Sequence, residues 1–365
     1  MITLSECMKF VTLHAKTLGV NKDINRLKPQ VVSTMDSYPH GWANIFFNAA
    51  VKKMLEGNTD KALGLYNIAR FPFPQTELQK KAYKEYLSLF EKKYLLSGEL
   101  KKQKTKEDEA VFYYKEGNAN NVIIICGGII SLKEQWVNAL KILHTFGFTV
   151  VLCELPGVGE NAIPFDKTCF DFFSKILNVL NVKENARCHA LAMSFSGYIA
   201  LKNSGTDPRI SSITMVGTPV ISVYHDLSYY EKIPTITRET LIHNISRFYP
   251  HINNADTLFE FLDSNFPAVN QIPENLNVFY VQSEFDEIIP ASEADFLKDH
   301  CDRFSLFNLP DVHGSPNFHH SVVLFILWSI LKSMHGNPSM IHFIKFLICI
   351  SKMSGAIKQK YFRAR

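Results

Sequence analysis

The sequence predicts an α/β fold in which a mostly parallel, doubly wound sheet follows an N-terminal helical segment. From residue 110 onward, short β-branched runs alternate with helical stretches, which is typical of strand–helix–strand units. Most of the inner runs are apolar throughout, as expected for strands that are covered on both faces. Before residue 110, apolar residues recur at helical spacing instead. A length of 365 residues suits a large core with a cap.

Helical signals fill much of the segment 1–109, which we interpret as a helical cap. Residues 1–35 are weakly patterned, and a first helix begins near Trp42. The residues around Asn58 end that helix and cap a second one, which stops at Pro72. A third helix begins near Thr76, and the charged stretch 97–109 is predicted to be a linker.

Seven strands are predicted in the core, which we assign to residues 110–335. They are Ala110–Tyr114, Val122–Cys126, Thr149–Cys153, Arg187–Ala192, Ile213–Val216, Asn277–Val281 and Phe304–Leu309. The gap after Ile213–Val216 is too long for a plain crossover. It is rich in Tyr and Phe, so we expect residues 218–274 to form an aromatic, mostly helical insertion over one end of the sheet. The excess of Phe and Tyr in the whole chain suggests an aromatic-lined cavity, and packing alone is the alternative explanation.

Net charge, cysteine spacing and the N-terminal pattern argue against several classes of function. The net charge of +4 is too small to indicate a nucleic-acid partner. The seven cysteines show no paired or zinc-binding spacing, and the N-terminus lacks the pattern of a secretory signal. A cytoplasmic location is therefore expected. The sequence indicates no metal and no cofactor, and it leaves a homodimer open.

The C-terminal segment 336–365 differs from the rest in charge. The stretch 312–365 contains seven basic residues and no acidic one, so the remaining chain has a net charge of −3. From Met340 the segment reads MIHFIKFLICISKMSGAIKQKYFRAR, without the ~18 consecutive apolar residues of a membrane span. One interpretation is an amphipathic helix on an anionic membrane. We favour a last helix packed on the domain, followed by a loose basic end.

The strongest chemical signal is the stretch ARCHALAMSFSGYIA. A predicted strand runs directly into Ser194 and a helix follows, which is the layout of a nucleophile elbow. Small residues must flank the serine because bulk there would collide with the neighbouring strand and helix. Ala192 and Ser196 stand where glycines are usual. The free N–H groups at the start of the following helix, that of Phe195 in particular, are suited to stabilise an oxyanion.

A second pair of glycines follows the strand Val122–Cys126. Paired glycines allow backbone N–H groups to turn toward a ligand, so the N–H of Gly128 or Ile129 is the expected second donor of an oxyanion hole. A tight turn without a chemical role is the simpler alternative.

An acidic cluster follows the strand Asn277–Val281. Glu284, Asp286 and Glu287 compete for the role of the acid that orients a catalytic histidine, and we favour Asp286 by its offset from Pro290.

His313 follows the last predicted strand and precedes an apolar helix, Ser321–Leu331. From there it is expected to act as the general base toward Ser194. His319 and His320 are rivals for this role. The three histidines are also a weak candidate for a metal site, because no carboxylate or cysteine stands at a recognised ligand spacing.

The order Ser, Asp, His, each after its own strand, is that of the α/β-hydrolase fold. The chain further resembles α/β-hydrolases with an N-terminal helical cap, the group around the fermentation–respiration switch protein FrsA that includes polyketide-shortening and pseudooxynicotine-type C–C hydrolases. The resemblance rests on the helical hairpin between Trp42 and Pro72 and on the motifs CGGIISLKEQW, ELPGVGE, AMSFSG, SEFDEIIP and DVHG. These stretches span most of residues 40–320.

The resemblance implies a serine hydrolase that cleaves a carbon–carbon bond between two carbonyls, or an ester. Its substrate would be a small carbonyl compound of aromatic or polyketide-like character. Two alternatives remain. One is a regulatory or binding protein on a hydrolase scaffold, since a fold does not determine function. The other is a lipid esterase at a membrane surface, suggested by the basic C-terminal segment.

Overall fold

The computed structural model describes the chain except residues 1, 37, 107–108, 270–271 and 364–365. In the last helix, side chains are not described at 354 and 356–363. Fifteen α-helices and eight strands occur in the described part.

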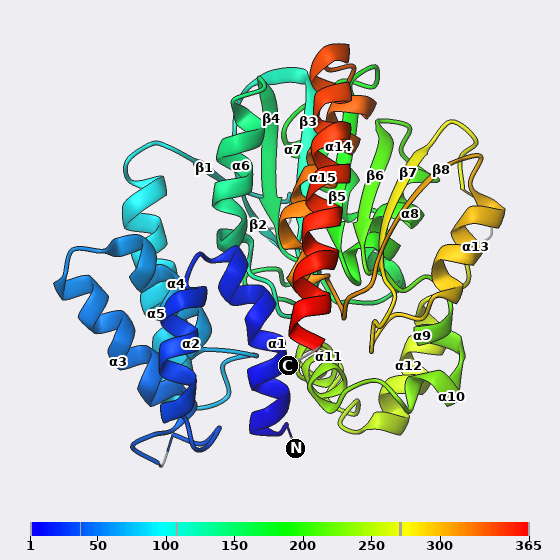
Figure 1. Cartoon of the computed structure of the whole chain (residues 1–365). Helices are drawn as coiled ribbons and strands as arrows, with labels where there is room; N and C mark the ends of the chain where they lie inside the picture. The colour runs from blue at the N-terminus through cyan, green and yellow to red at the C-terminus, as the bar shows by residue number, and fades with distance from the viewer. Residues whose placement is uncertain (1, 37, 107–108, 270–271, 364–365) are drawn as a thin grey trace.

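The strands form one sheet in the order β1-β2-β4-β3-β5-β6-β7-β8 (Figure 1). β1 and β2 pair antiparallel, β2 is also antiparallel to β4, and all other neighbours are parallel. The strands are β1 Lys101–Lys104, β2 Val111–Lys115, β3 Asn118–Cys126, β4 Phe148–Cys153, β5 Arg187–Met193, β6 Ile210–Val216, β7 Asn277–Ser283 and β8 Arg303–Leu309.

All seven predicted strands are present, several with longer ends. The difference is β1, which lies inside the segment 97–109 that we predicted as a linker. Its four residues are all exposed, so it lacks the apolar alternation by which a strand is recognised. It is an edge strand held by its register with β2, in which Lys101 pairs with Tyr114.

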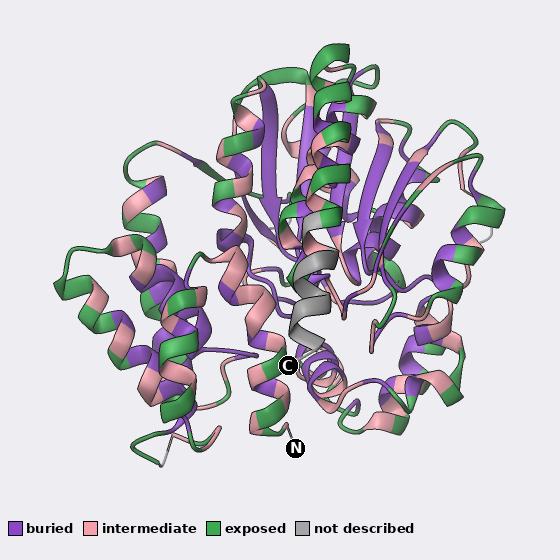
Figure 2. Cartoon of the chain, in the orientation of Figure 1, coloured by how far each residue is buried: buried purple, intermediate pink, exposed green. Residues whose placement is uncertain are grey.

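Helices cover both faces of the sheet. α6 and α14 lie on one face, with α15 outside α14, while α7 and α8 lie on the other (Figure 1). Because of this cover, β4 and β5 are buried over almost their whole length, and β3 is buried from Val122 to Cys126 (Figure 2). The helices of the core are α6 Val137–His144, α7 Phe172–Val179, α8 Ser196–Ser204, α13 Ser292–His300, α14 His319–Ser333 and α15 Pro338–Arg363.

The N-terminal segment is helical from its beginning. Its helices are α1 Leu4–Thr17, α2 Asn21–Leu27, α3 Trp42–Leu55, α4 Thr59–Ala69 and α5 Glu77–Phe90. The hairpin α3–α4 is present where it was predicted, although α4 ends at Ala69 rather than at Pro72. The Asn58 side chain caps α4 by accepting from the N–H of Lys61 at 3.3 Å.

The weak pattern of residues 1–35 conceals α1 and α2. α1 starts at a capping box in which the side chains of Thr3 and Glu6 each accept from the other's backbone N–H. It buries Cys7, Val11 and Ala15 at a spacing of four. α1 contacts α4 of the cap, α11 of the insertion and the 3₁₀ turn η5, Pro316–Phe318, and so lies between them (Figure 1).

The insertion between β6 and β7 is helical, as expected, and lies beyond the carboxyl ends of the strands (Figure 1). It contains α9 Ser222–His225, α10 Leu227–Tyr230, α11 Thr235–Ser246 and α12 Ala255–Asn265. Its aromatic rings pack on one another and on the core, as in the stacked pair Tyr224–Phe266 with ring centroids 5.0 Å apart. No helix in the described residues is both long enough and apolar enough to cross a bilayer.

Candidate active site

Ser194 occupies the sharp turn between β5 and α8. Its φ angle is +56°, in the left-handed region that residues other than glycine rarely adopt. The turn is held on both sides, because the Ser194 N–H donates to the Val216 carbonyl at 2.9 Å. The Ser194 carbonyl accepts from the Gly197 N–H at 3.0 Å and from the Thr218 hydroxyl at 2.9 Å. This is the strained geometry of a nucleophile elbow.

The two departures from the usual glycines fit this turn. Ala192 and Ser196 are fully buried. The Ser196 hydroxyl lies 3.0 Å from the carbonyl oxygens of both Cys126 and Met193, so its polar group is satisfied. The position that tolerates no side chain is Gly197, where a Cβ would lie 2.2 Å from Oγ1 of Thr218.

Asp286 and His313 come together at the ends of β7 and β8. Nδ1 of His313 lies 2.8 Å from Oδ2 and 3.0 Å from Oδ1 of Asp286. The Asp286 side chain is 2% exposed, and its Oδ1 accepts from the N–H groups of Ile288 and Ile289, each at 2.9 Å. These backbone hydrogen bonds hold the carboxylate in place beside the imidazole. The neutral ring therefore carries its proton on Nδ1, which donates to Asp286.

The rivals to these two residues have other positions. Glu284 is exposed. Glu287 accepts from the backbone N–H of His313 at 3.2 Å and forms an ion pair with Lys9 of α1 at 3.0 Å. His320 is exposed, whereas His319 lines the same cavity as His313 from the start of α14.

The loop after β3 lies directly against the elbow. A Cβ on Gly128 would lie 3.0 Å from Cβ of Ser194, so a larger residue here would press on the nucleophile turn, and glycine suits this close approach. Gly128, Ile129 and Phe195 border the same cavity as Ser194 and His313.

Two side chains from outside the core hold this loop. Asn244 of α11 donates to the Ile129 carbonyl at 3.0 Å. Arg70, at the end of α4, donates to the Ile130 carbonyl at 2.7 Å and is 2% exposed. The cap and the insertion therefore orient two consecutive peptide planes next to the candidate oxyanion donors.

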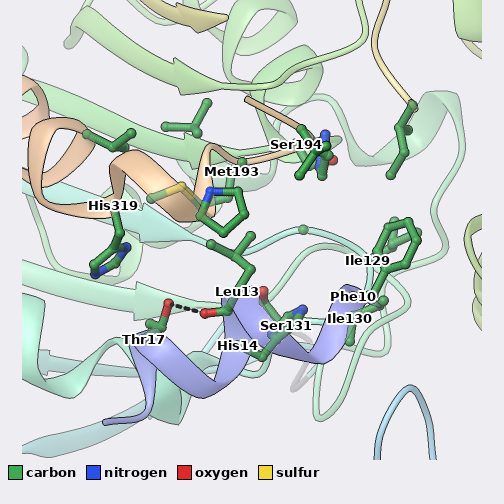
Figure 3. Close-up of a pocket in the computed structure, with 18 of the residues that line it drawn as sticks. Phe10, Leu13, His14, Thr17, Ile129, Ile130, Ser131, Met193, Ser194 and His319 are labelled. Carbon is green, nitrogen blue, oxygen red and sulfur yellow. Dashed lines mark hydrogen bonds between the residues drawn. The ribbon is translucent and has the colours of Figure 1, made fainter. Parts of the chain in front are cut away.

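The cavity has a volume of about 160 Å³. Figure 3 shows α1 carrying Phe10, Leu13 and His14 along one wall, with Met193 and Ser194 across from them. The other apolar lining comes mainly from aliphatic residues of the loops after β3 and β8 and of α14. The aromatic residues of the lining are Phe10, Trp136 and Phe195. The Tyr and Phe residues of the insertion do not border the cavity, and they pack within the protein instead.

Comparison with solved structures relates this geometry to known proteins. AbyA5 is similar with 25% identity over 94% of this chain and 98% of its own, at a TM-score of 0.84. A second AbyA5 structure gives 26% identity over 88% and 97% of the two chains, at a TM-score of 0.78. 2,6-Dihydroxy-pseudo-oxynicotine hydrolase is similar at 17% identity over 84% and 86%, with a TM-score of 0.59.

The chain is an α/β-hydrolase. No protein-family model and no curated protein sequence matches it. The similarity to AbyA5 extends over nearly the whole of both chains, so it includes the N-terminal helices as well as the sheet. The predicted fold and the predicted resemblance are confirmed.

The motifs that distinguish this α/β-hydrolase form a buried ion network. Nζ of Lys133, from the SLKE motif, lies 2.9 Å from Glu134, 3.2 Å from Glu154 and 2.7 Å from Glu160. Glu154 and Glu160 begin and end the ELPGVGE motif. Burial, partly offset by Lys133, raises the pKa of Glu154 to about 7. The network ties the loop after β3 to the loop after β4 and contributes no side chain to the cavity.

Sequence reasoning missed one residue that the pairing of Asp286 and His313 needs. Gly217 follows β6 with a φ of +56°. A Cβ there would lie 3.0 Å from Cε1 of His313 and 3.3 Å from Oδ2 of Asp286. Its position immediately after a buried strand was the available signal. Among the described residues, no group of three or more His, Cys, Asp or Glu side chains is placed to hold a metal ion.

Proposed function

We propose that this α/β-hydrolase is a serine hydrolase that transfers an acyl group from a small apolar carbonyl compound to water. The observation that carries the proposal is that Ser194, in its strained turn, borders the same cavity as His313, whose Nδ1 is held by Asp286 at 2.8 Å. A nucleophile, a base and an orienting acid are thus available at one site.

In the proposed reaction, Nε2 of His313 takes the proton of the Ser194 hydroxyl while the oxygen attacks the substrate carbonyl. The N–H groups of Phe195 and of Gly128 or Ile129 stabilise the resulting oxyanion. Collapse breaks the bond to the leaving group, which departs with the electron pair and receives the proton from His313. Water then attacks the acyl–serine ester by the same route and releases a carboxylic acid and free Ser194.

The substrate class follows from the cavity. Its volume of about 160 Å³ and its largely aliphatic wall suit an acyl group about as large as a benzene ring. The leaving group is either the alcohol of an ester or the enolate of a 1,3-diketone, since the same acyl–serine step serves both. The predicted resemblance favours the diketone. The proposed acyl group can be aromatic as well as aliphatic, provided that it is of this size.

Intact mass after treatment with a small fluorophosphonate tests the nucleophile. We expect one adduct on the wild-type protein and none on Ser194→Ala, with Ser196→Ala as the matched control that keeps the adduct. A folded wild-type protein that forms no adduct would support the alternative of a binding protein on a hydrolase scaffold.

A panel of short-chain esters and 1,3-diketones then identifies the leaving group. Turnover of diketones to a carboxylic acid and a ketone, lost in Ser194→Ala, supports carbon–carbon cleavage. Turnover of esters alone assigns a carboxylesterase.

A further inference from the structure

The last helix, α15, has one face that is built into the protein. Ile344 and Ile348 are buried, and the Ser351 hydroxyl is 2.7 Å from that of Ser321 on α14. A Cβ at Gly355 would lie 2.5 Å from the ring of Phe318 in η5. These contacts fix the orientation of the helix, so the face that it presents to solvent is also fixed.

That outer face is apolar. The side chains of Met340, Phe343, Phe346, Ile350 and Met353 are between 41% and 68% exposed. Their spacing of three or four residues aligns them in one stripe along the helix, here called the outer stripe. Figure 2 shows the exposed side of α15 facing away from the sheet. A contiguous exposed apolar patch often marks an interaction surface, whereas single exposed apolar residues are common on any protein.

Charge decides among the partners for the outer stripe. The stretch 312–365 has seven basic residues and no acidic one, whereas the rest of the chain has a net charge of −3. A second copy docked on this stripe by twofold symmetry would bring two such basic stretches together. An anionic lipid surface would bury the apolar side chains of the stripe and would also attract the positive charge of this stretch.

We propose that α15 docks the protein on an anionic membrane surface through the outer stripe. The inner face stays packed on α14, so the helix lies along the surface and only the stripe enters the headgroup region. This proposal is independent of the reaction at Ser194.

Docking in this orientation has a consequence for the cavity. α15 packs against α14 and η5, and both contribute to the cavity wall, η5 through Pro316 and α14 through Val322, Val323 and Ile326. Val323 is 42% exposed. Membrane docking would therefore hold the apolar cavity close to the lipid, from which an apolar carbonyl compound could enter.

Vesicle flotation tests the proposal with the full chain. The wild-type protein should float with vesicles of phosphatidylcholine mixed with phosphatidylserine and stay behind with phosphatidylcholine alone, and added salt should weaken the binding. The double change Phe343→Ser and Phe346→Ser should weaken vesicle binding by about tenfold or more. The matched control is Leu55→Ser with Leu96→Ser, two leucines that are 86% and 77% exposed elsewhere.

Cys349 provides a second readout. It is the exposed cysteine of the described residues, next to Ile350, and the other six are buried. A polarity-sensitive dye attached there should shift to shorter wavelength on anionic vesicles. All four stripe and control positions are exposed, so the variants should unfold at the wild-type temperature.

The proposal is overturned if the wild-type protein fails to bind anionic vesicles, or if the Phe343 and Phe346 changes leave binding intact. A concentration-dependent dimer in sedimentation, abolished by the same two changes, would assign the stripe to self-association instead.

Discussion

Opposing influences set the proton affinity of His313. Burial lowers the pKa of the imidazole, but the charge and hydrogen bond of Asp286, with a smaller contribution from Glu287, raise it above its usual value. A general base works when it is neutral, so activity should rise as the pH increases through this raised pKa.

The change Asp286→Asn tests this assignment. It removes the charge that raises the pKa of His313, so the acidic limb of the profile of kcat/KM against pH should move to lower pH. kcat should also fall by about four orders of magnitude, because the imidazolium loses its partner. Glu284→Gln alters an exposed carboxylate of the same loop and should leave both the pH profile and kcat unchanged. If the acidic limb of the profile stays in place in Asp286→Asn, the pairing of Asp286 with His313 is contradicted.

Asn244 is expected to act at a distance from the substrate, through the Ile129 carbonyl. Asn244→Asp keeps the size of the side chain but cannot donate, so the loop after β3 should shift. We expect kcat to fall by about 10- to 100-fold with little change in KM, measured by steady-state kinetics. Asn265→Ala removes an amide that donates to the Phe261 carbonyl on α12, and it should have no such effect. A rise in KM with kcat unchanged would indicate a binding role instead.

At the scale of elements, α1 is the part of the site that the sequence concealed. It supplies Phe10, Leu13 and His14 to the cavity wall. Leu13 also packs against Gly314, where a Cβ would lie 2.5 Å from Cδ2 of Leu13. α1 therefore sets the size of the acyl pocket beside the histidine loop.

Leu13→Ala should enlarge that pocket. We expect the preferred acyl chain to lengthen, with kcat/KM for a longer substrate rising relative to a shorter one by about tenfold. The measurement is kcat/KM across a homologous series of acyl substrates. Leu4→Ala, on the same helix but outside the cavity lining, is the control, and an unchanged chain-length profile in Leu13→Ala would exclude this role for α1.

The strand-end residues could be predicted because the information is local. Each strand was recognised by its β-branched run, and a parallel sheet brings the loops after its strands to one edge. That reasoning selected Ser194, Asp286 and His313, which the structure brings to one edge of the sheet. Their catalytic roles remain predictions.

The remaining site residues could not be predicted because they depend on long-range contacts. Arg70 and Ile130 are 60 residues apart, and Asn244 and Ile129 are 115 residues apart. No periodicity connects such pairs. α1 was missed for a different reason, since only three of its fourteen residues are fully buried and its apolar pattern is correspondingly weak.

For the whole molecule, the buried network around Lys133 is expected to matter more than any surface ion pair. Lys133→Met would leave Glu134 and Glu154, both fully buried, without their cation. We expect a loss of about 3–5 kcal/mol in the free energy of unfolding, measured with urea. Lys141→Met breaks a part-exposed pair with Glu99 and should cost about 0–1 kcal/mol. Similar losses in the two variants would argue against the network.

The hydrogen bonds from Arg70 and Asn244 to the loop after β3 have a consequence for engineering. Helices that look like an exchangeable cover over a finished catalytic core hold part of that core in place. Grafting the N-terminal helices or the insertion of another α/β-hydrolase onto this chain, in order to change its substrate range, would also remove the side chains that orient the Ile129 and Ile130 peptides. Substrate range and catalytic rate are thus coupled in this protein, and selection for one will act on the other.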